Sequence, residues 1–162
     1  MPLPRSLRGK IVAASVALAV ALALAFAALV VTIDKSREAA QLAERSEQVA
    51  AAANLLERMV LDLETGQRAY VITGKRSYLE PMEDALRRYP HQADLLRGLA
   101  ADASQRRRVD ELRSRMDAYV REWSRPVVDR ARVDQEAAAK LVAGGGGKRR
   151  VDALRVRFEI FR

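Results

Sequence analysis

The sequence predicts an all-α protein in which an N-terminal transmembrane helix continues into an antiparallel four-helix bundle. Three observations support this prediction. One long apolar stretch lies near the N-terminus, the remainder is rich in the helix-favouring residues Ala, Leu, Arg and Glu, and its apolar residues recur at spacings of three and four. No stretch alternates polar and apolar residues of β-favouring types, so a sheet is not expected.

The apolar stretch covers residues 11–33 and contains no charged residue. A helix of this length spans roughly 35 Å, enough to cross a hydrocarbon core of about 30 Å. The alternative is a cleaved signal peptide, because Ala25-Phe26-Ala27 resembles a cleavage site. The apolar region of a signal peptide is normally about 7–15 residues long, so we interpret this longer stretch as a retained anchor in the lipid bilayer.

The charges beside the apolar stretch predict its orientation. Three basic residues precede it and an acidic residue follows it directly (Arg5, Arg8 and Lys10; Asp34). The positive-inside rule then places residues 1–10 in the cytoplasm and residues 34–162 on the extracytoplasmic side of the cytoplasmic (inner) membrane.

The segment 34–73 is expected to extend the membrane helix as the first helix of the bundle. Apolar residues recur seven apart, with a second set at intermediate positions (Leu42, Val49, Leu56, Leu63 and Tyr70; Ala52, Met59 and Gly66). This spacing places one apolar stripe along a helix. The helix is expected to end at Thr73, with Gly74 in the left-handed conformation that caps helix C-termini.

Three further amphipathic stretches complete the predicted bundle. The second helix is expected to begin at Ser77, with Glu80 completing a capping box, and to end or kink at Pro90. The third is expected to open at Ser104 and to bend at Pro126, and its buried stripe comprises Val109, Leu112, Met116, Tyr119, Trp123 and Val127. A short helix over 133–142, a break at Gly144–Gly147 and a last helix carrying Val151, Leu154, Phe158 and Phe161 follow.

The composition argues against catalysis, metal binding and nucleic-acid binding. The chain has no cysteine, and His91 is its single histidine, so we expect no disulfide, metal site, catalytic triad or cofactor. The net charge of +8 is spread over interleaved helical faces, unlike the concentrated basic surface of nucleic-acid binders. The run from Gly144 to Lys148 departs from the phosphate-binding loop pattern and is expected to be a linker. We therefore predict that this chain is not an enzyme.

The segment 61–74 departs from the simple amphipathic pattern. It contains Gly66 within a helix, where glycine is unfavourable, so we expect close packing or a distortion there. Glu64 and Arg68 have the spacing of an intrahelical ion pair. Counted from the apolar stripe, Glu64, Thr65 and Arg68 lie on the far side of the helix, facing water, a dimer partner or a ligand. An ordinary surface salt bridge is the alternative interpretation.

The same segment resembles a known family. The run Glu64-Thr65-Gly66-Gln67-Arg68, followed by Tyr70, Thr73-Gly74 and Tyr78-Leu79-Glu80-Pro81, resembles the signature of the CHASE family, type three, and Trp123 and Gly147-Lys148 resemble its later part. The resemblance implies an extracytoplasmic sensory domain of a bacterial membrane receptor over residues 34–162. It marks Glu64, Thr65, Gln67, Arg68, Tyr70 and Thr73 as candidate ligand or dimer contacts, and Gly66, Gly74, Tyr78, Leu79, Pro81 and Trp123 as structural residues. Ala69 and Lys75 depart from the family pattern.

From these observations we expect the input domain of a transmembrane receptor of the sensor histidine kinase (two-component system), cyclase or phosphatase type. It would relay a small-molecule or physical stimulus by helix movement, as a homodimer. Members of the family typically continue into a second membrane helix and an output module, and we expect both after Arg162. The alternative is a membrane-tethered helical scaffold or dimerisation module with no sensing role.

Overall fold

The computed structural model describes the backbone of residues 5–161, with side chains described continuously from residue 39. The helices are α1 (Arg5–Thr73), α2 (Glu80–Leu99), α3 (Ala103–Tyr119), α4 (Arg125–Val133), α5 (Gln135–Ala143) and α6 (Gly146–Phe158), with short helical segments η1 (Arg76–Leu79), η2 (Val120–Ser124) and η3 (Glu159–Phe161). No strand occurs between residues 5 and 161. The all-α prediction is confirmed, and the chain divides into two units, residues 1–44 and 45–162.

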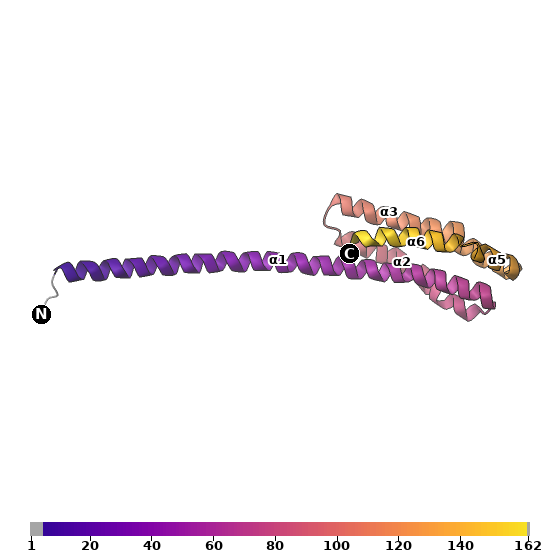
Figure 1. The fold of residues 1–162 in the computed structure, drawn as a ribbon, viewed down its shortest axis with the longest axis horizontal. Coiled ribbons are helices and arrows are strands. Elements are labelled where there is room, and N and C mark those ends of the chain that lie inside the picture. Colours follow the sequence, from indigo (N-terminus) through magenta and orange to yellow (C-terminus); the bar gives the residue numbers. More distant parts are fainter. Residues whose placement is uncertain (1–4, 162) are drawn as a thin grey trace. The chain divides into compact units, whose positions relative to one another are not determined.

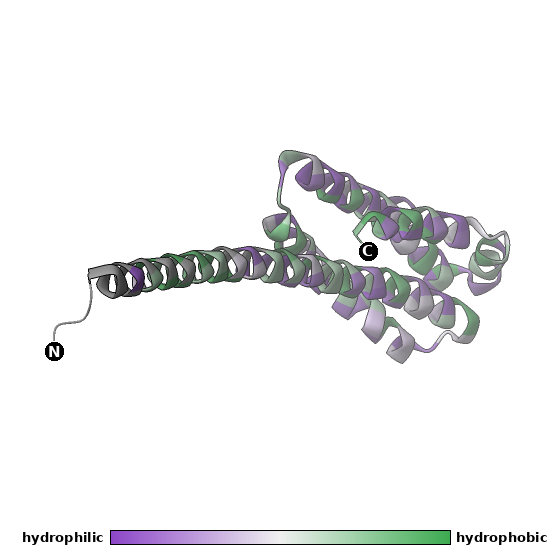
Figure 2. Cartoon of the chain, turned by 60° about the vertical axis from the view of Figure 1, so that its left-hand side comes forward, coloured by the Kyte–Doolittle hydropathy of each residue, from purple (hydrophilic) through white to green (hydrophobic). Residues whose placement is uncertain are grey.

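The described part of the N-terminal unit consists of α1 alone. Figure 2 shows the apolar colour along this part of the helix, and its most apolar 18-residue window has a mean hydropathy of 2.8 with none of it buried. Among the described residues, α1 is the one helix long and apolar enough to cross a membrane. Leu42, expected on the bundle stripe, is 68% exposed. That expectation was wrong, because Leu42 belongs to a unit that offers no second helix to cover it.

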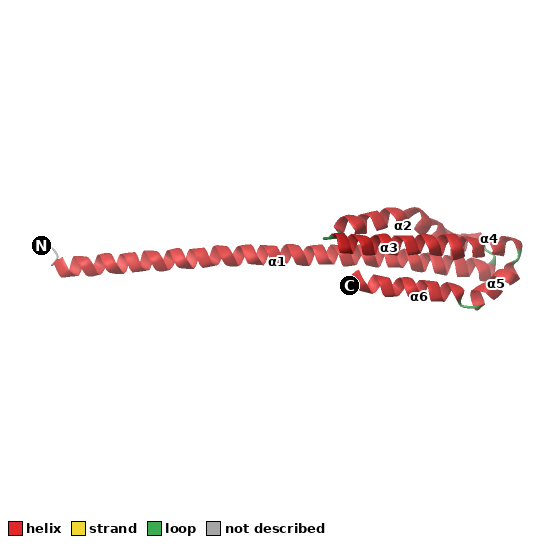
Figure 3. Cartoon of the chain, turned by 90° about the horizontal axis from the view of Figure 1, so that it is seen from above, coloured by secondary structure: helices red, strands yellow, loops and turns green. Residues whose placement is uncertain are grey.

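The unit from residue 45 onward is a bundle with one main core. Figures 1 and 3 show α2, α3 and α6 alongside the C-terminal part of α1. Each of these helices contributes buried side chains to the same cluster, among them Leu56 and Leu63 from α1, Leu96 from α2, Leu112 and Met116 from α3, and Leu154 and Phe158 from α6. Packing of this kind, at roughly 1.5–3 kcal/mol for each large apolar side chain, is what stabilises the bundle. The short helix α5 lies at one end, where Ala138 packs with Val71 and Val127.

The C-terminal end of α1 has the predicted form. Gly74 adopts a φ of +69°, and its N–H donates to the carbonyl oxygen of Tyr70 at 2.8 Å, which satisfies one of the last helical carbonyls. Gly66 is packed closely, as expected. A Cβ at this position would lie 2.9 Å from the carbonyl oxygen of Tyr78 and 3.1 Å from Cβ of Met82. The absence of a side chain at Gly66 therefore lets the start of the α2 segment approach α1.

The second helical stretch begins near Ser77, as predicted, but without the predicted cap. The segment η1 occupies Arg76–Leu79, and α2 begins at Glu80 without a side-chain cap from Ser77. Pro81 lies in the first turn of α2, where a residue without an N–H costs no helical hydrogen bond.

Pro90 does not end α2, which continues to Leu99. Tertiary contacts on both sides of the proline account for this. The Tyr89 hydroxyl donates to the Asp117 carboxylate at 2.7 Å, and the Gln92 side-chain amide donates to the carbonyl oxygen of Ala52 at 3.1 Å. Burial and the negative charge of Asp117 raise the pKa of Tyr89 to about 12, so the tyrosine remains a donor at neutral pH.

The third predicted helix is longer and less regular than expected. Asp102, rather than Ser104, caps α3, and its carboxylate accepts from the backbone N–H of Gln105 at 2.8 Å. The helix then passes through the π-helical segment η2 into α4. A proline inside an α-helix clashes with the carbonyl four residues before it, and the wider π turn just ahead of Pro126 accommodates that ring. The chain therefore stays helical to Val133.

The glycine break is shorter than expected. Asp134 caps α5 by accepting from the N–H of Ala137 at 2.9 Å, and α5 ends at Ala143. Gly145 adopts a φ of +72°, and α6 already begins at Gly146. Gly146 and Gly147 are thus part of a helix rather than of a linker, and a side chain at either position would collide with the indole ring of Trp123.

Candidate functional site

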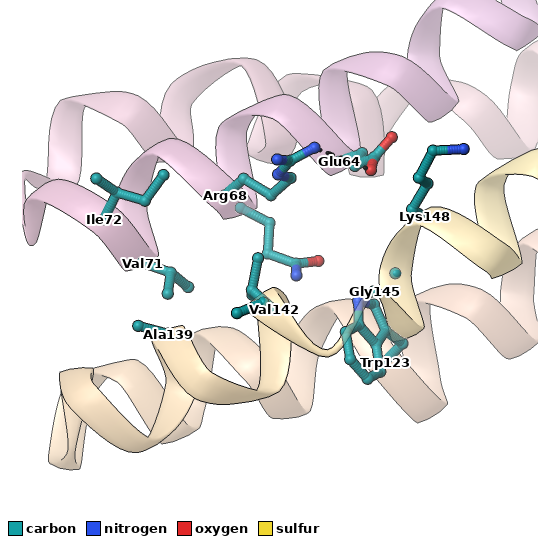
Figure 4. Close-up of a pocket in the computed structure, with 12 residues that line it drawn as sticks. Glu64, Arg68, Val71, Ile72, Trp123, Ala139, Val142, Gly145 and Lys148 are labelled. Carbon is teal, nitrogen blue, oxygen red and sulfur yellow. Dashed lines mark ion pairs between the residues drawn. The ribbon is translucent and has the colours of Figure 1, made fainter.

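The bundle unit contains a cavity of about 370 Å³ at the end where α1 finishes. Its walls come from α1, η2, α5, the turn after α5, and α6, as Figure 4 shows. The residues that line it are Glu64, Gln67, Arg68, Val71, Ile72, Trp123, Ala139, Val142, Ala143, Gly145, Gly147 and Lys148. Part of the signature segment therefore faces a concave site.

Polar side chains from α1 form one edge of the cavity. A guanidinium nitrogen of Arg68 lies 3.5 Å from a carboxylate oxygen of Glu64, which is the predicted intrahelical ion pair (Figure 4). The Arg68 side chain is 54% exposed, whereas the Glu64 side chain is only 14% exposed. Of the three surroundings expected for Glu64, which were water, a dimer partner or a ligand, its low exposure and its place in the cavity wall favour a ligand.

Gln67 is the most buried polar residue of the cavity. It is 1% exposed, and its Oε1 atom has no hydrogen-bond partner among the described residues. Buried polar atoms are normally paired, and an unpaired one costs roughly 1–3 kcal/mol. Gln67 lies four residues after Leu63 and four before Val71, both fully buried. Its position on the apolar stripe could have revealed its burial from the sequence.

Trp123 forms the floor of the cavity and is held in place by glycines. A Cβ at Gly146 would lie 2.6 Å from the indole ring, and a Cβ at Gly147 would lie 2.7 Å from its Nε1 atom. The guanidinium of Arg150 lies 5.0 Å from the ring centroid, in cation–π range. The indole Nε1–H is buried and finds no acceptor among the described residues.

Tyr119 adds a further buried polar group near the cavity. Its hydroxyl has no partner among the described residues. Burial, and secondarily the negative charge of Glu64, raise the pKa of Tyr119 well above its usual value, so the phenol is neutral. From its spacing in the sequence, Tyr119 was expected only in the core. Across the described side chains, the three buried polar atoms without a partner belong to Gln67, Tyr119 and Trp123. All three lie at this end of the bundle.

The rest of the cavity combines an apolar wall with a second cation. Val71 and Ile72 of α1 lie opposite Ala139 and Val142 of α5, and Lys148 stands on α6 across from Glu64 (Figure 4). The Lys148 ammonium pairs with Asp152 one turn along α6. Two cations and one anion therefore line the site, and each cation has a carboxylate partner on its own helix.

The structure brings together only part of the predicted site. Glu64, Gln67, Arg68 and Trp123 line the cavity, but Thr65, Tyr70 and Thr73 do not. Thr65 is exposed, Tyr70 packs against the core, and the Thr73 hydroxyl donates to the carbonyl oxygen of Ala69 at 2.7 Å. Of the predicted structural residues outside α1, Leu79 is buried, whereas Tyr78 and Pro81 are exposed.

The described residues contain no group of three or more His, Cys, Asp or Glu side chains placed to hold a metal ion. Among the described residues that line the cavity, Glu64 supplies the one carboxylate, and it is paired with Arg68. The site can bind a ligand through hydrogen bonds, charge and apolar contacts.

Comparison with known proteins identifies the family. The family model described as the CHASE3 domain matches residues 39–162, and no curated protein and no solved structure matches the chain. CHASE3 domains form a family of extracellular sensory domains of signalling receptors. The match covers most of the chain and includes every residue that lines the cavity. The chain therefore belongs to the CHASE3 family.

Proposed function

We propose that this chain is the input domain of a bacterial transmembrane receptor with a histidine kinase, cyclase or phosphatase output. One observation carries the proposal beyond the family assignment. A single helix, α1, contains both the apolar stretch and the cavity residues Glu64, Gln67 and Arg68. A change at the cavity therefore acts directly on the helix that is expected to enter the membrane.

The proposed mechanism is a shift between two packings of the bundle. One wall of the cavity belongs to α1, and the other walls belong to η2, α5 and α6. A ligand that contacts both sides stabilises whichever packing brings them closer. Packed helices respond to such a bias by sliding or rotating by about 1–2 Å rather than by deforming continuously.

The proposal also covers the side of the membrane on which the bundle lies and the oligomeric state of the receptor. The N-terminus is cytoplasmic, the bundle lies outside the cytoplasmic membrane, and the receptor is a homodimer. The basic residues before the apolar stretch support the orientation through the positive-inside rule.

Spin labels on α1 and α6 test the proposed movement. The sequence has no cysteine, so Asn54→Cys with Val156→Cys introduces one label pair into the full chain, which is reconstituted in lipid nanodiscs. Ala139→Leu, which adds bulk to the cavity wall, is expected to change the distance distribution measured by pulsed electron paramagnetic resonance. Singly labelled chains report the distance between protomers and so test the homodimer.

The matched control is Leu141→Phe, because Leu141 is an exposed residue on the same helix as Ala139. It is expected to leave the α1–α6 distance distribution unchanged. If Ala139→Leu also leaves it unchanged, the bundle behaves as a rigid scaffold and the sensory proposal fails.

A further inference from the structure

We infer that the cavity binds a small carboxylic acid that carries an apolar body and a hydrogen-bond donor beside the carboxylate. Aliphatic α-amino and α-hydroxy acids have this chemistry. The inference rests on the proposed sensory function and names the class of ligand for the same site. It follows from three features of the cavity: the two cations that line it, its unpaired hydrogen-bonding atoms and its apolar wall.

The charges favour an anionic head group. Arg68 and Lys148 line the cavity, and each is paired with a carboxylate on its own helix, one turn away. Intrahelical pairs of this kind are weak, so both cations can share their charge with a ligand. Arg68 in particular has five N–H donors and holds Glu64 at the long distance of 3.5 Å. The Nε1–H of Trp123 supplies a further donor that is unpaired among the described residues.

The unpaired acceptor at Gln67 adds a second requirement for the ligand, a hydrogen-bond donor. Gln67 is 99% buried, lines the cavity and has an Oε1 atom without a donor among the described residues. An N–H or O–H group on the ligand satisfies this atom, and Glu64 adds negative charge on the same face of α1. A ligand with a carboxylate but no adjacent donor leaves Gln67 unsatisfied. A ligand with a hydroxyl or ammonium group beside its carboxylate can bind the cations and Gln67 at the same time.

The apolar wall and the volume of the cavity limit the polarity and the size of the rest of the ligand. Val71, Val142 and Ala139 face the same space and present only hydrocarbon. The volume of about 370 Å³ falls near the lower end of the range for small-molecule sites, which is about 300–1,000 Å³. A short branched or linear aliphatic side chain fits this space.

Fluorescence of the full chain in nanodiscs tests the inference, because Trp123 is the single tryptophan and lines the cavity. The probes are L-leucine, 2-hydroxy-4-methylpentanoate, 4-methylpentanoate, which lacks the adjacent donor, and 3-methylbutylamine, which lacks the carboxylate. The first two are expected to change the Trp123 emission saturably. The third should bind at least about tenfold more weakly, because a buried polar group is then left unpaired. The amine should produce no saturable change.

Two variants assign the roles of the residues. Gln67→Leu keeps a similar volume and removes the unpaired acceptor, so it should weaken leucine binding by at least about tenfold while the melting temperature stays the same or rises. Arg68→Gln should weaken binding of both acids. The control is Arg58→Gln, which changes an exposed arginine of α1 outside the cavity and should leave binding unchanged.

The inference is overturned if neither acid changes the emission saturably, or if 4-methylpentanoate binds as tightly as its hydroxy analogue. A Gln67→Leu variant that loses stability would also overturn it, since Gln67 would then be a structural residue. The proposed function is tested separately by the α1–α6 distance. A response of that distance to Ala139→Leu, combined with no binding of the acids, refutes the ligand class and leaves the sensory role in place.

Discussion

Leu63→Ala is expected to lower the free energy of unfolding by about 2–5 kcal/mol. Leu63 is completely buried on α1 and belongs to the main core. Its truncation removes apolar contacts and leaves a cavity that a close-packed bundle fills only in part. Denaturant titration of the full chain in nanodiscs, followed by circular dichroism, measures the loss.

Arg68→Ala is the control for this substitution, because it lies five residues further along the same helix with a side chain that is 54% exposed. The Arg68 guanidinium reaches solvent, and an intrahelical pair at this spacing contributes only about 0.2–0.5 kcal/mol, so this variant should remain nearly as stable as the natural chain. Equal losses for the two variants would place Arg68 in the structural core and remove the basis for its role at the cavity.

Phe158→Ala is expected to lower the free energy of unfolding by about 3–5 kcal/mol. Phe158 ends α6, is 1% exposed and packs in the same cluster as residues of α1 and α3. Its truncation removes the largest fully buried side chain of the core. The same titration measures this loss.

Val156→Ala is the matched control, since Val156 lies on the same helix and is 67% exposed. Substitutions at exposed positions usually change stability by less than about 0.5 kcal/mol. A small effect at Phe158 would show that α6 does not return to the core. In that case α6 could not form a wall of the cavity together with α1.

The sequence predicted the helices well because their stripes are regular. In α3 the spacing of Val109, Leu112 and Met116 alone determines which face is buried, and all three side chains are buried. Gly74 was equally predictable, since a glycine after a long amphipathic helix favours the left-handed cap that the structure shows.

The helix boundaries near prolines were less predictable, because tertiary contacts decide them. Pro90 remains inside α2, where Tyr89 and Gln92 form hydrogen bonds to neighbouring helices. No local sequence pattern predicts the partners of these two residues. The π-helical segment η2 is a similar case. It sets the position of Trp123, and the sequence shows only the proline that follows it.

The cavity could be predicted only in part. Its α1 edge, Glu64, Gln67 and Arg68, lies within the family signature, and Trp123 was also singled out from the sequence. Lys148 lies in the later part of the family resemblance, but Ala139 and Val142 carry no comparable signal, because they become neighbours of α1 only when α5 folds against it. The burial of Gln67 was not predicted, because only Glu64, Thr65 and Arg68 were assigned to a face of the helix and Gln67 was identified through the family resemblance alone.

The side of the membrane on which the bundle lies is the most direct test of an extracytoplasmic sensory domain. In this cysteine-free chain, Ser77→Cys places a thiol at an exposed position of the bundle, and Ser6→Cys places one before the apolar stretch. Each variant is treated in intact spheroplasts with a maleimide that cannot cross the membrane. We predict that the Ser77→Cys variant is labelled at once and that the Ser6→Cys variant is labelled only after the membrane is disrupted. The reverse pattern would place the bundle in the cytoplasm and contradict the proposed function.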